Sequence, residues 1–140
     1  MPIYRCTIPQ ASVSDEDKSE IALEITRIHC DACPGTPESF VHVVFEEVPR
    51  GNGFRGGQHS AATLVHGTIR AGREQSVRTR IVTDISQMWS KVTGQSENDI
   101  LALVVEVPAS NAVEGGSVMP EPGEEAQWLA RHGLVNESPT

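Results

Sequence analysis

Two arginines stand three residues apart in the run Ile69-Arg70-Ala71-Gly72-Arg73. Each guanidinium presents a rigid fork of N–H donors that matches a carboxylate, and residues at this spacing can face one side of a turn or helix. The chain is otherwise acidic, with 19 Asp and Glu against 11 Lys and Arg and a net charge of −8. The pair therefore favours a small carboxylate substrate and would also stabilise a developing enolate. The alternative is that Arg70 and Arg73 are surface residues paired with local acids such as Glu74.

The chain begins Met-Pro, and Pro2 can act chemically only if Met1 is removed, which a small second residue favours. A proline inside a chain has no basic nitrogen, whereas a terminal proline is a secondary amine. An α-amine titrates near 8 in model peptides, and burial or nearby cations lower its pKa. Pro2 beside the arginine pair would then serve as a general base, or as a general acid if the site keeps it protonated. Many proteins begin Met-Pro without catalytic use of the proline, so this feature alone decides nothing.

A CxxC motif, Cys30 to Cys33, could in principle bind metal or carry redox chemistry. A structural zinc site needs four ligands, and the sequence has no second CxxC and no HxxxH. Redox motifs of this kind open a helix, whereas this one falls where a predicted helix ends. We interpret these cysteines as incidental thiols and expect no metal and no cofactor.

Length and composition predict one soluble domain: 140 residues, 38% hydrophobic and 21% charged. The acidic balance argues against a nucleic-acid partner, because a phosphate backbone would be repelled. No apolar run is long enough to span a bilayer, and the N-terminus lacks the features of a signal peptide. We therefore expect a cytoplasmic protein without a membrane partner.

The sequence predicts an internal repeat, in which one strand–helix–strand unit occurs twice. These elements must position the residues described above. Apolar residues at helical spacing recur 60 positions apart, and the strand ends Phe45 to Pro49 and Val104 to Pro108 match at an offset of 59. Repeat one covers about residues 2–49 and repeat two about residues 62–108, and each predicts parallel strands joined by a right-handed crossover. The expected elements are strands at 3–8, 41–45, 63–69 and 100–105, of which the second reads as buried, and helices that begin near Ser14 and before Val77.

The remaining segments carry weaker signals. The glycine-rich residues 51–59 lack a phosphate-binding motif and predict a linker or surface loop. The tail, residues 109–140, contains one helical candidate at 123–132, anchored by Trp128 and Leu129, and residues 136–140 are expected to be disordered. Trp89 and Trp128 fit helix packing better than a binding role.

Five motifs in this order resemble the tautomerase superfamily, and more closely its cis-3-chloroacrylic acid dehalogenase subgroup. They are Pro2-Ile3-Tyr4-Arg5-Cys6, His29, the arginine run from Ile69 to Arg73, Glu106 to Glu114, and Pro120 to Trp128. The resemblance spans Pro2 to about Trp128. It implies an α/β (α+β) fold in which two fused β-α-β units form a four-stranded sheet with two helices on one face, assembled as a homotrimer.

The resemblance also implies roles for five residues. Pro2 and Glu114 would be catalytic, and His29, Arg70 and Arg73 would bind a small carboxylate substrate. Without it, Glu114 reads as a solvated loop residue and His29 as a structural histidine. The chain departs from the subgroup at its active-site tyrosine, where it has Leu103, which cannot donate or accept a hydrogen bond.

The leading functional hypothesis is a tautomerase for small 2-oxo acids such as phenylpyruvate, with Pro2 as base and low promiscuous hydratase or dehalogenase activity. The alternative is a cis-3-chloroacrylic acid dehalogenase or hydratase, with Pro2 as acid and Glu114 activating water; Leu103 argues against its efficiency. Decarboxylation of malonate semialdehyde is a third possibility, from a sister family. A non-catalytic oligomeric module is a fourth, although packing requires neither Pro2 nor the arginine pair.

Overall fold

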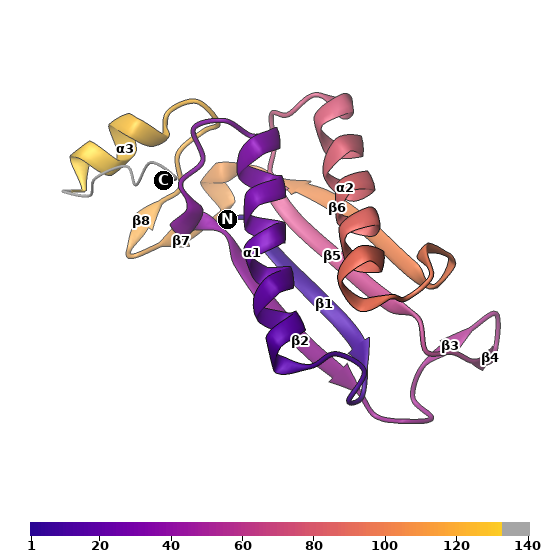
Figure 1. Cartoon of the computed structure of the whole chain (residues 1–140). Helices are drawn as coiled ribbons and strands as arrows, with labels where there is room; N and C mark the ends of the chain where they lie inside the picture. The colour runs from indigo at the N-terminus through magenta and orange to yellow at the C-terminus, as the bar shows by residue number, and fades with distance from the viewer. Residues whose placement is uncertain (133–140) are drawn as a thin grey trace.

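One four-stranded sheet, covered on one face by two helices, forms the body of the protein (Figure 1). The computed structural model describes residues 1–132, so the expected disorder of residues 136–140 falls outside it. The strand order is β2-β1-β5-β6. The central elements are β1 (Ile3–Pro9), α1 (Asp15–Ala32), β2 (His42–Val48), β5 (Thr63–Arg70), α2 (Gln75–Thr93) and β6 (Ile100–Val107).

The predicted repeat is confirmed in the topology of the sheet. Strands β1 and β2 pair in parallel, as do β5 and β6, and the two units meet through the antiparallel pair of β1 with β5. Because β1 and β5 run in opposite directions, the start of β1 lies beside the end of β5. This arrangement brings the N-terminus of the chain close to the arginine run.

The two helices form where the apolar spacing predicts them. Ser14 caps α1, its Oγ accepting a hydrogen bond from the Asp17 amide at 3.1 Å, and three acids occupy the first turn. The predicted apolar stripes are buried in both helices. They pack on alternate residues of the strands and form one core. The stripe residues are Ile21, Ile25 and Ile28 in α1 and Ile81, Ile85 and Met88 in α2.

Among residues 1–132, no helix covers the opposite face of the sheet, so the prediction that residues 41–45 form a buried strand is only half right. Val43 and Phe45 pack against the core, whereas Val44 is 41% exposed. Alternate residues of a strand point to opposite faces, and here only one face has a covering layer. Large apolar side chains are exposed on β5 and β6 as well: Leu64, Leu101, Leu103 and Val105.

The glycine-rich residues 51–59 form a hairpin, which corrects the prediction of a linker or loop. Strand β3 (Phe54–Arg55) pairs with β4 (Gln58–His59), and the intervening Gly56 and Gly57 have φ of 59° and 80°. Positive φ at both central residues is what a two-residue hairpin turn requires.

A second hairpin follows β6, where Gly115 and Gly116 form the same turn. It consists of β7 (Val113–Glu114) and β8 (Ser117–Val118), 59 positions after the first hairpin. The predicted tail helix is confirmed as α3 (Glu125–Arg131), with Trp128 and Leu129 buried. Short 3₁₀ turns complete the described chain: η1 (Glu38–Phe40), η2 (Glu97–Asp99) and η3 (Ala109–Asn111).

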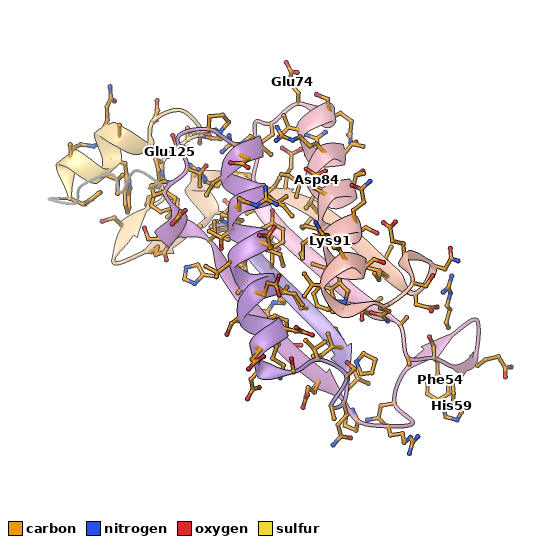
Figure 2. The ribbon with its side chains drawn as sticks, viewed as in Figure 1. Phe54, His59, Glu74, Asp84, Lys91 and Glu125 are labelled. Carbon is orange, nitrogen blue, oxygen red and sulfur yellow. The ribbon has the colours of Figure 1, made fainter. Side chains whose placement is uncertain are left out.

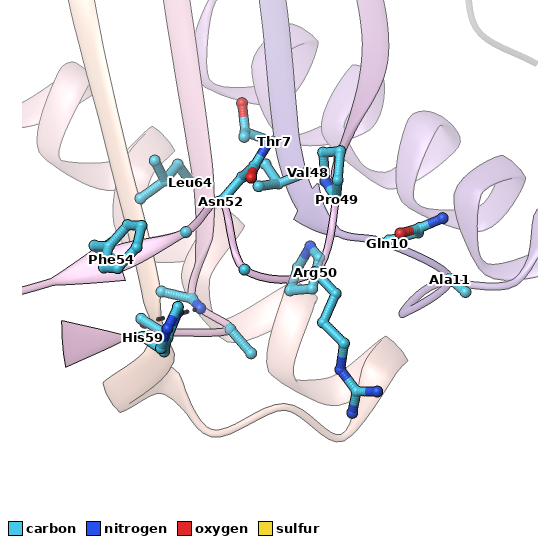
Figure 3. A pocket seen from close by; sticks show the side chains of 16 residues that line it. Thr7, Gln10, Ala11, Val48, Pro49, Arg50, Asn52, Phe54, His59 and Leu64 are labelled. Carbon is cyan, nitrogen blue, oxygen red and sulfur yellow. Dashed lines mark hydrogen bonds between the residues drawn. The ribbon is translucent and has the colours of Figure 1, made fainter.

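A groove lies at the end of β1 that is remote from the N-terminus (Figure 3). Its walls come from the end of β1 and from the segment that carries the first hairpin, where the rings of Phe54 and His59 stack 4.7 Å apart. None of the predicted site residues lines this groove. Across residues 1–132, no helix is both long enough and apolar enough to cross a membrane.

Candidate functional site

The N-terminus is buried at the start of β1. Pro2 is fully buried, and its carbonyl accepts a hydrogen bond from the His42 amide at 3.0 Å. Met1 is 8% exposed, and its amino nitrogen donates to Oε2 of Glu114 at 3.5 Å. Burial lowers the pKa of this amine below its usual value; Glu114 opposes the shift and Arg70 adds to it. The fold thus places a terminal amine in a site that favours its uncharged form.

The second hairpin presents Glu114 to this amine. Its Oε1 lies 2.6 Å from Nε2 of His42, while Oε2 faces the N-terminus. One carboxylate therefore bridges the start of β2 and the start of the chain. His42 could not be recognised in the sequence as a site residue, because no spacing links it to Glu114, which is 72 residues away.

Arg70 is the last residue of β5, and its guanidinium is bound by the chain itself. It donates to Oε1 of Glu125 at 2.9 Å and to the Pro120 carbonyl at 2.7 Å. Both side chains of the ion pair are almost completely buried, at 1% and 2% exposure. Breaking such a pair would leave an uncompensated buried charge, so Arg70 is held firmly in place.

Arg73 lies in the loop between β5 and α2 and has weaker partners. Its guanidinium reaches Oγ1 of Thr36 at 3.5 Å and Oε1 of Glu125 at 3.9 Å, and its side chain is 12% exposed. Arg70 also donates to Oγ1 of Thr36, at 3.4 Å. The two arginines therefore converge on one point, and Arg73 keeps most of its donors for another acceptor.

The loop that holds Arg73 is fixed by Glu106. Its Oε2 accepts a hydrogen bond from the Gly72 amide at 3.1 Å, and its Oε1 forms an ion pair with Arg78 at 2.9 Å. Gly72 has a φ of 112°, a conformation that L side chains rarely adopt. A glycine between the two arginines is thus required by the turn that brings them together.

The alternative in which these arginines pair with Glu74 is wrong. Among the ion pairs of residues 1–132, both guanidiniums meet Glu125, and neither meets Glu74. Figure 2 shows Glu74 pointing outward at the start of α2, well away from Glu125 at the start of α3. Glu125 is a site residue that the sequence analysis did not single out. The only signal was its place in the C-terminal motif, Pro120 to Trp128.

His29 is buried in the last turn of α1, at 2% exposure. Its Nδ1 lies 2.7 Å from the Tyr4 hydroxyl, and the two rings meet edge to face. Burial lowers the pKa of His29 to about 3, and the charges of Arg73, Arg70 and the terminal amine contribute in the same direction. His29 is therefore a neutral ring near the two arginines and the N-terminus.

The CxxC motif shows no sign of reactivity. Burial raises the pKa of Cys30 to about 11 and also raises the pKa of Cys33, so both remain thiols at neutral pH. Within residues 1–132, no group of three or more His, Cys, Asp and Glu could hold a metal ion.

The structure thus places Pro2, His29, Arg70, Arg73 and Glu114 at one end of the sheet. Their roles stay a prediction. The fold does not bring Leu103 to them. Leu103 pairs with His66 in the middle of the sheet and lies, 37% exposed, on the face that has no helices.

Comparison with known proteins gives a family match over nearly the whole chain. The Tautomerase_3 family model, described as "Putative oxalocrotonate tautomerase enzyme", matches residues 1–132. A comparison with curated proteins finds no significant match.

Three solved structures illustrate the similarity. Native Ps01740 is 37% identical, with 80% of this chain and 99% of its own chain covered and a TM-score of 0.77. N1, described as a member of the cis-3-chloroacrylic acid dehalogenase family, is 26% identical over 91% of this chain and 90% of its own, with a TM-score of 0.88. A fused 4-OT, described as a symmetric trimer, is 16% identical over 84% and 94%, with a TM-score of 0.76, and shows likeness of fold alone.

Proposed function

Because the chain belongs to the tautomerase superfamily and to its cis-3-chloroacrylic acid dehalogenase-like subgroup, we propose that it interconverts the enol and keto forms of small 2-oxo acids. The observation that carries the proposal is the buried terminal amine, which faces Glu114 and feels the charge of Arg70. After loss of Met1, this amine is the secondary amine of Pro2. Met1 itself is buried, so its removal also opens space for a substrate.

In the proposed reaction, Pro2 moves one proton. Its uncharged nitrogen accepts the proton of the substrate's C2 hydroxyl, the O–H electrons form the C2 carbonyl, and the C2=C3 electrons take a proton from the Pro2 ammonium at C3. Atoms and charge balance without a cofactor. Glu114, beside the amine, would stabilise the ammonium that exists between the two transfers.

The substrate carboxylate would bind to the arginine pair. The guanidinium of Arg73 makes only long contacts with Thr36 and Glu125 and is partly exposed, so its N–H groups would donate directly to the substrate carboxylate. Arg70 is committed to Glu125 and Pro120 and would contribute charge and hold the site in shape.

A second candidate is hydration and dehalogenation of a haloacrylate, which the similarity to N1 favours. It requires Glu114 to activate water and Pro2 to be protonated. The same buried position lowers the pKa of the Met1 amine, which supports an uncharged base at this end of β1 instead, and Leu103 offers no group to handle water.

Replacing Glu114 by glutamine separates the two candidates. Since glutamine cannot act as a base, chloride release from cis-3-chloroacrylate should disappear. Ketonisation of phenylenolpyruvate should fall no more than about tenfold, the effect of one lost charge interaction of about 1.4 kcal/mol. Ultraviolet absorbance follows the enol and a chloride assay follows the halide, with Glu121→Gln, which changes an exposed glutamate, as the matched control. Wild-type chloride release faster than ketonisation would favour the second candidate.

We also propose that the chain assembles as a homotrimer through the face of the sheet that has no helices. Support comes from the large exposed apolar side chains on three of its strands, since contiguous patches of this kind mark interfaces, and from the fused 4-OT trimer. Sedimentation equilibrium should give a trimer, and Leu101→Glu, in which Leu101 is 54% exposed, should dissociate it. A 15.1 kDa monomer in the wild type contradicts this assembly.

A further inference from the structure

Tyr4 and His29 form a buried pair that the proposed reaction does not by itself explain. Tyr4 is fully buried and is the only tyrosine of the chain. Its hydroxyl lies 2.7 Å from Nδ1 of His29, which joins the first strand to the last turn of α1. A short hydrogen bond between two buried polar groups fixes the orientation of both rings.

Gly67 makes room for this pair. It lies directly opposite Tyr4 in the antiparallel register of β1 and β5. A Cβ at this position would be 2.5 Å from Cε1 of Tyr4, closer than such contacts ever occur. One edge of the Tyr4 ring therefore occupies the space that a side chain at Gly67 would need, although a glycine in the middle of a strand otherwise weakens the strand.

The hydrogen of this bond belongs to Tyr4. Burial raises the pKa of the phenol and lowers that of His29, so both groups are uncharged at neutral pH. If Nδ1–H donated to the phenol oxygen, the phenol hydrogen would be buried without an acceptor among the described residues, because its one partner there is His29. The phenol therefore donates to Nδ1, and the ring hydrogen of His29 lies on Nε2.

The Nε2–H donor is open to a group outside the described chain. Among residues 1–132, the one side-chain hydrogen bond of His29 is made by Nδ1, so Nε2 is not used by the described part of the chain. The residue is 2% exposed while the buried Met1 is in place. The same ring feels the charges of Arg73, Arg70 and the terminal amine. A donor in this position can meet an oxygen of a substrate held between those groups.

We propose that Tyr4 is a positioning residue that locks His29 as the Nε2–H tautomer and thereby aims a neutral hydrogen-bond donor at the C2 oxygen of the substrate. This role rests on the proposed function, since it assigns His29 to the enol or keto oxygen. In this arrangement Arg73 binds the substrate carboxylate, and His29 donates a hydrogen bond to the substrate oxygen on which negative charge develops.

The tautomer can be read directly by ¹⁵N NMR of histidine-labelled protein with Met1 removed. At pH 7, His29 should show a protonated Nε2 and an unprotonated, hydrogen-bonded Nδ1. A protonated Nδ1, or a doubly protonated ring, would overturn the proposal whether or not any variant folds. An Nε2–H tautomer in an enzyme without activity on 2-oxo acids would instead count against the proposed function alone.

Tyr4→Phe keeps the ring and removes only the hydroxyl. The Nδ1 resonance of His29 should then shift toward that of a free acceptor, and kcat for ketonisation should fall about tenfold with little change in KM. The matched control is Thr63→Val, which removes another buried hydroxyl, 2.7 Å from Gln95 at the opposite end of the sheet. Thr63→Val should leave the resonance and kcat unchanged. Equal effects of the two substitutions, or no effect of Tyr4→Phe on the resonance, would overturn the role of Tyr4.

Discussion

Removal of Met1 should raise kcat/KM for the ketonisation of phenylenolpyruvate at least about 100-fold, the range that a positioned general base supplies. In the chain that keeps Met1, the nitrogen of Pro2 is an amide without a basic electron pair, and the terminal amine belongs to the residue that fills the site. The two forms differ by one residue and are distinguished by intact mass. A methionine aminopeptidase converts one into the other, so activity should rise in proportion to the fraction that has lost Met1.

The pH dependence provides a second readout of the same amine. Burial lowers the pKa of the Met1 amine in the folded protein, and the fully buried Pro2 becomes the terminal residue once Met1 is removed. We therefore expect burial to lower the pKa of the Pro2 amine as well, so that kcat/KM falls as the pH drops through that lowered value. The apparent pKa of this limb should therefore lie below the 8 expected of an exposed α-amine. Pro2→Ala should reduce the rate, whereas Pro9→Ala, at the other end of β1, should not. A fully active protein that retains Met1 would remove the basis of the mechanism.

The fold could be predicted largely from local spacing. The apolar stripes from Ile21 to Ile28 and from Ile81 to Met88 predicted the two helices. The offset of about 60 residues between matching positions predicted the two β-α-β units. The first hairpin was missed although its Gly56-Gly57 turn recurs as Gly115-Gly116, beside Glu114. Glycines there permit a turn, but the sequence alone does not reveal that two short flanking segments pair.

Candidate site residues could be predicted from the sequence only where the family resemblance implied a role for them. The resemblance implied roles for Pro2, the arginine pair, His29 and Glu114. It did not reveal that Glu125 neutralises Arg70 or that His42 binds Glu114, because these contacts join residues 55 and 72 positions apart. Such pairs have no periodicity and depend on how the tail folds back onto the sheet.

The buried ion pair leads to opposite expectations for two arginines that look equivalent in sequence. Arg73→Ala should raise KM for a 2-oxo acid roughly 10- to 100-fold, since a hydrogen bond to a charged group contributes about 1.5–3 kcal/mol. Stability should change little, because its contacts with Thr36 and Glu125 are long. The matched control is Arg27→Ala, which removes an exposed guanidinium that pairs only within α1.

Arg70→Ala should instead act mainly on stability. It leaves the carboxylate of Glu125 buried without its cation, which costs about 3–5 kcal/mol in the free energy of unfolding. For a chain of this length, thermal denaturation should show a melting temperature lower by about 10 °C or more.

Combining Arg70→Met with Glu125→Leu should restore much of this lost stability, since an apolar pair of similar volume is often as stable as a buried ion pair. The double variant would still lack the charge of Arg70, so its stability should recover while any rise in KM seen with Arg70→Ala persists. The opposite result would be that Arg70→Ala and Arg73→Ala raise KM equally and leave stability unchanged. That result would contradict the expectation, since both guanidiniums would then bind the substrate alike and the ion pair of Arg70 with Glu125 would not stabilise the fold.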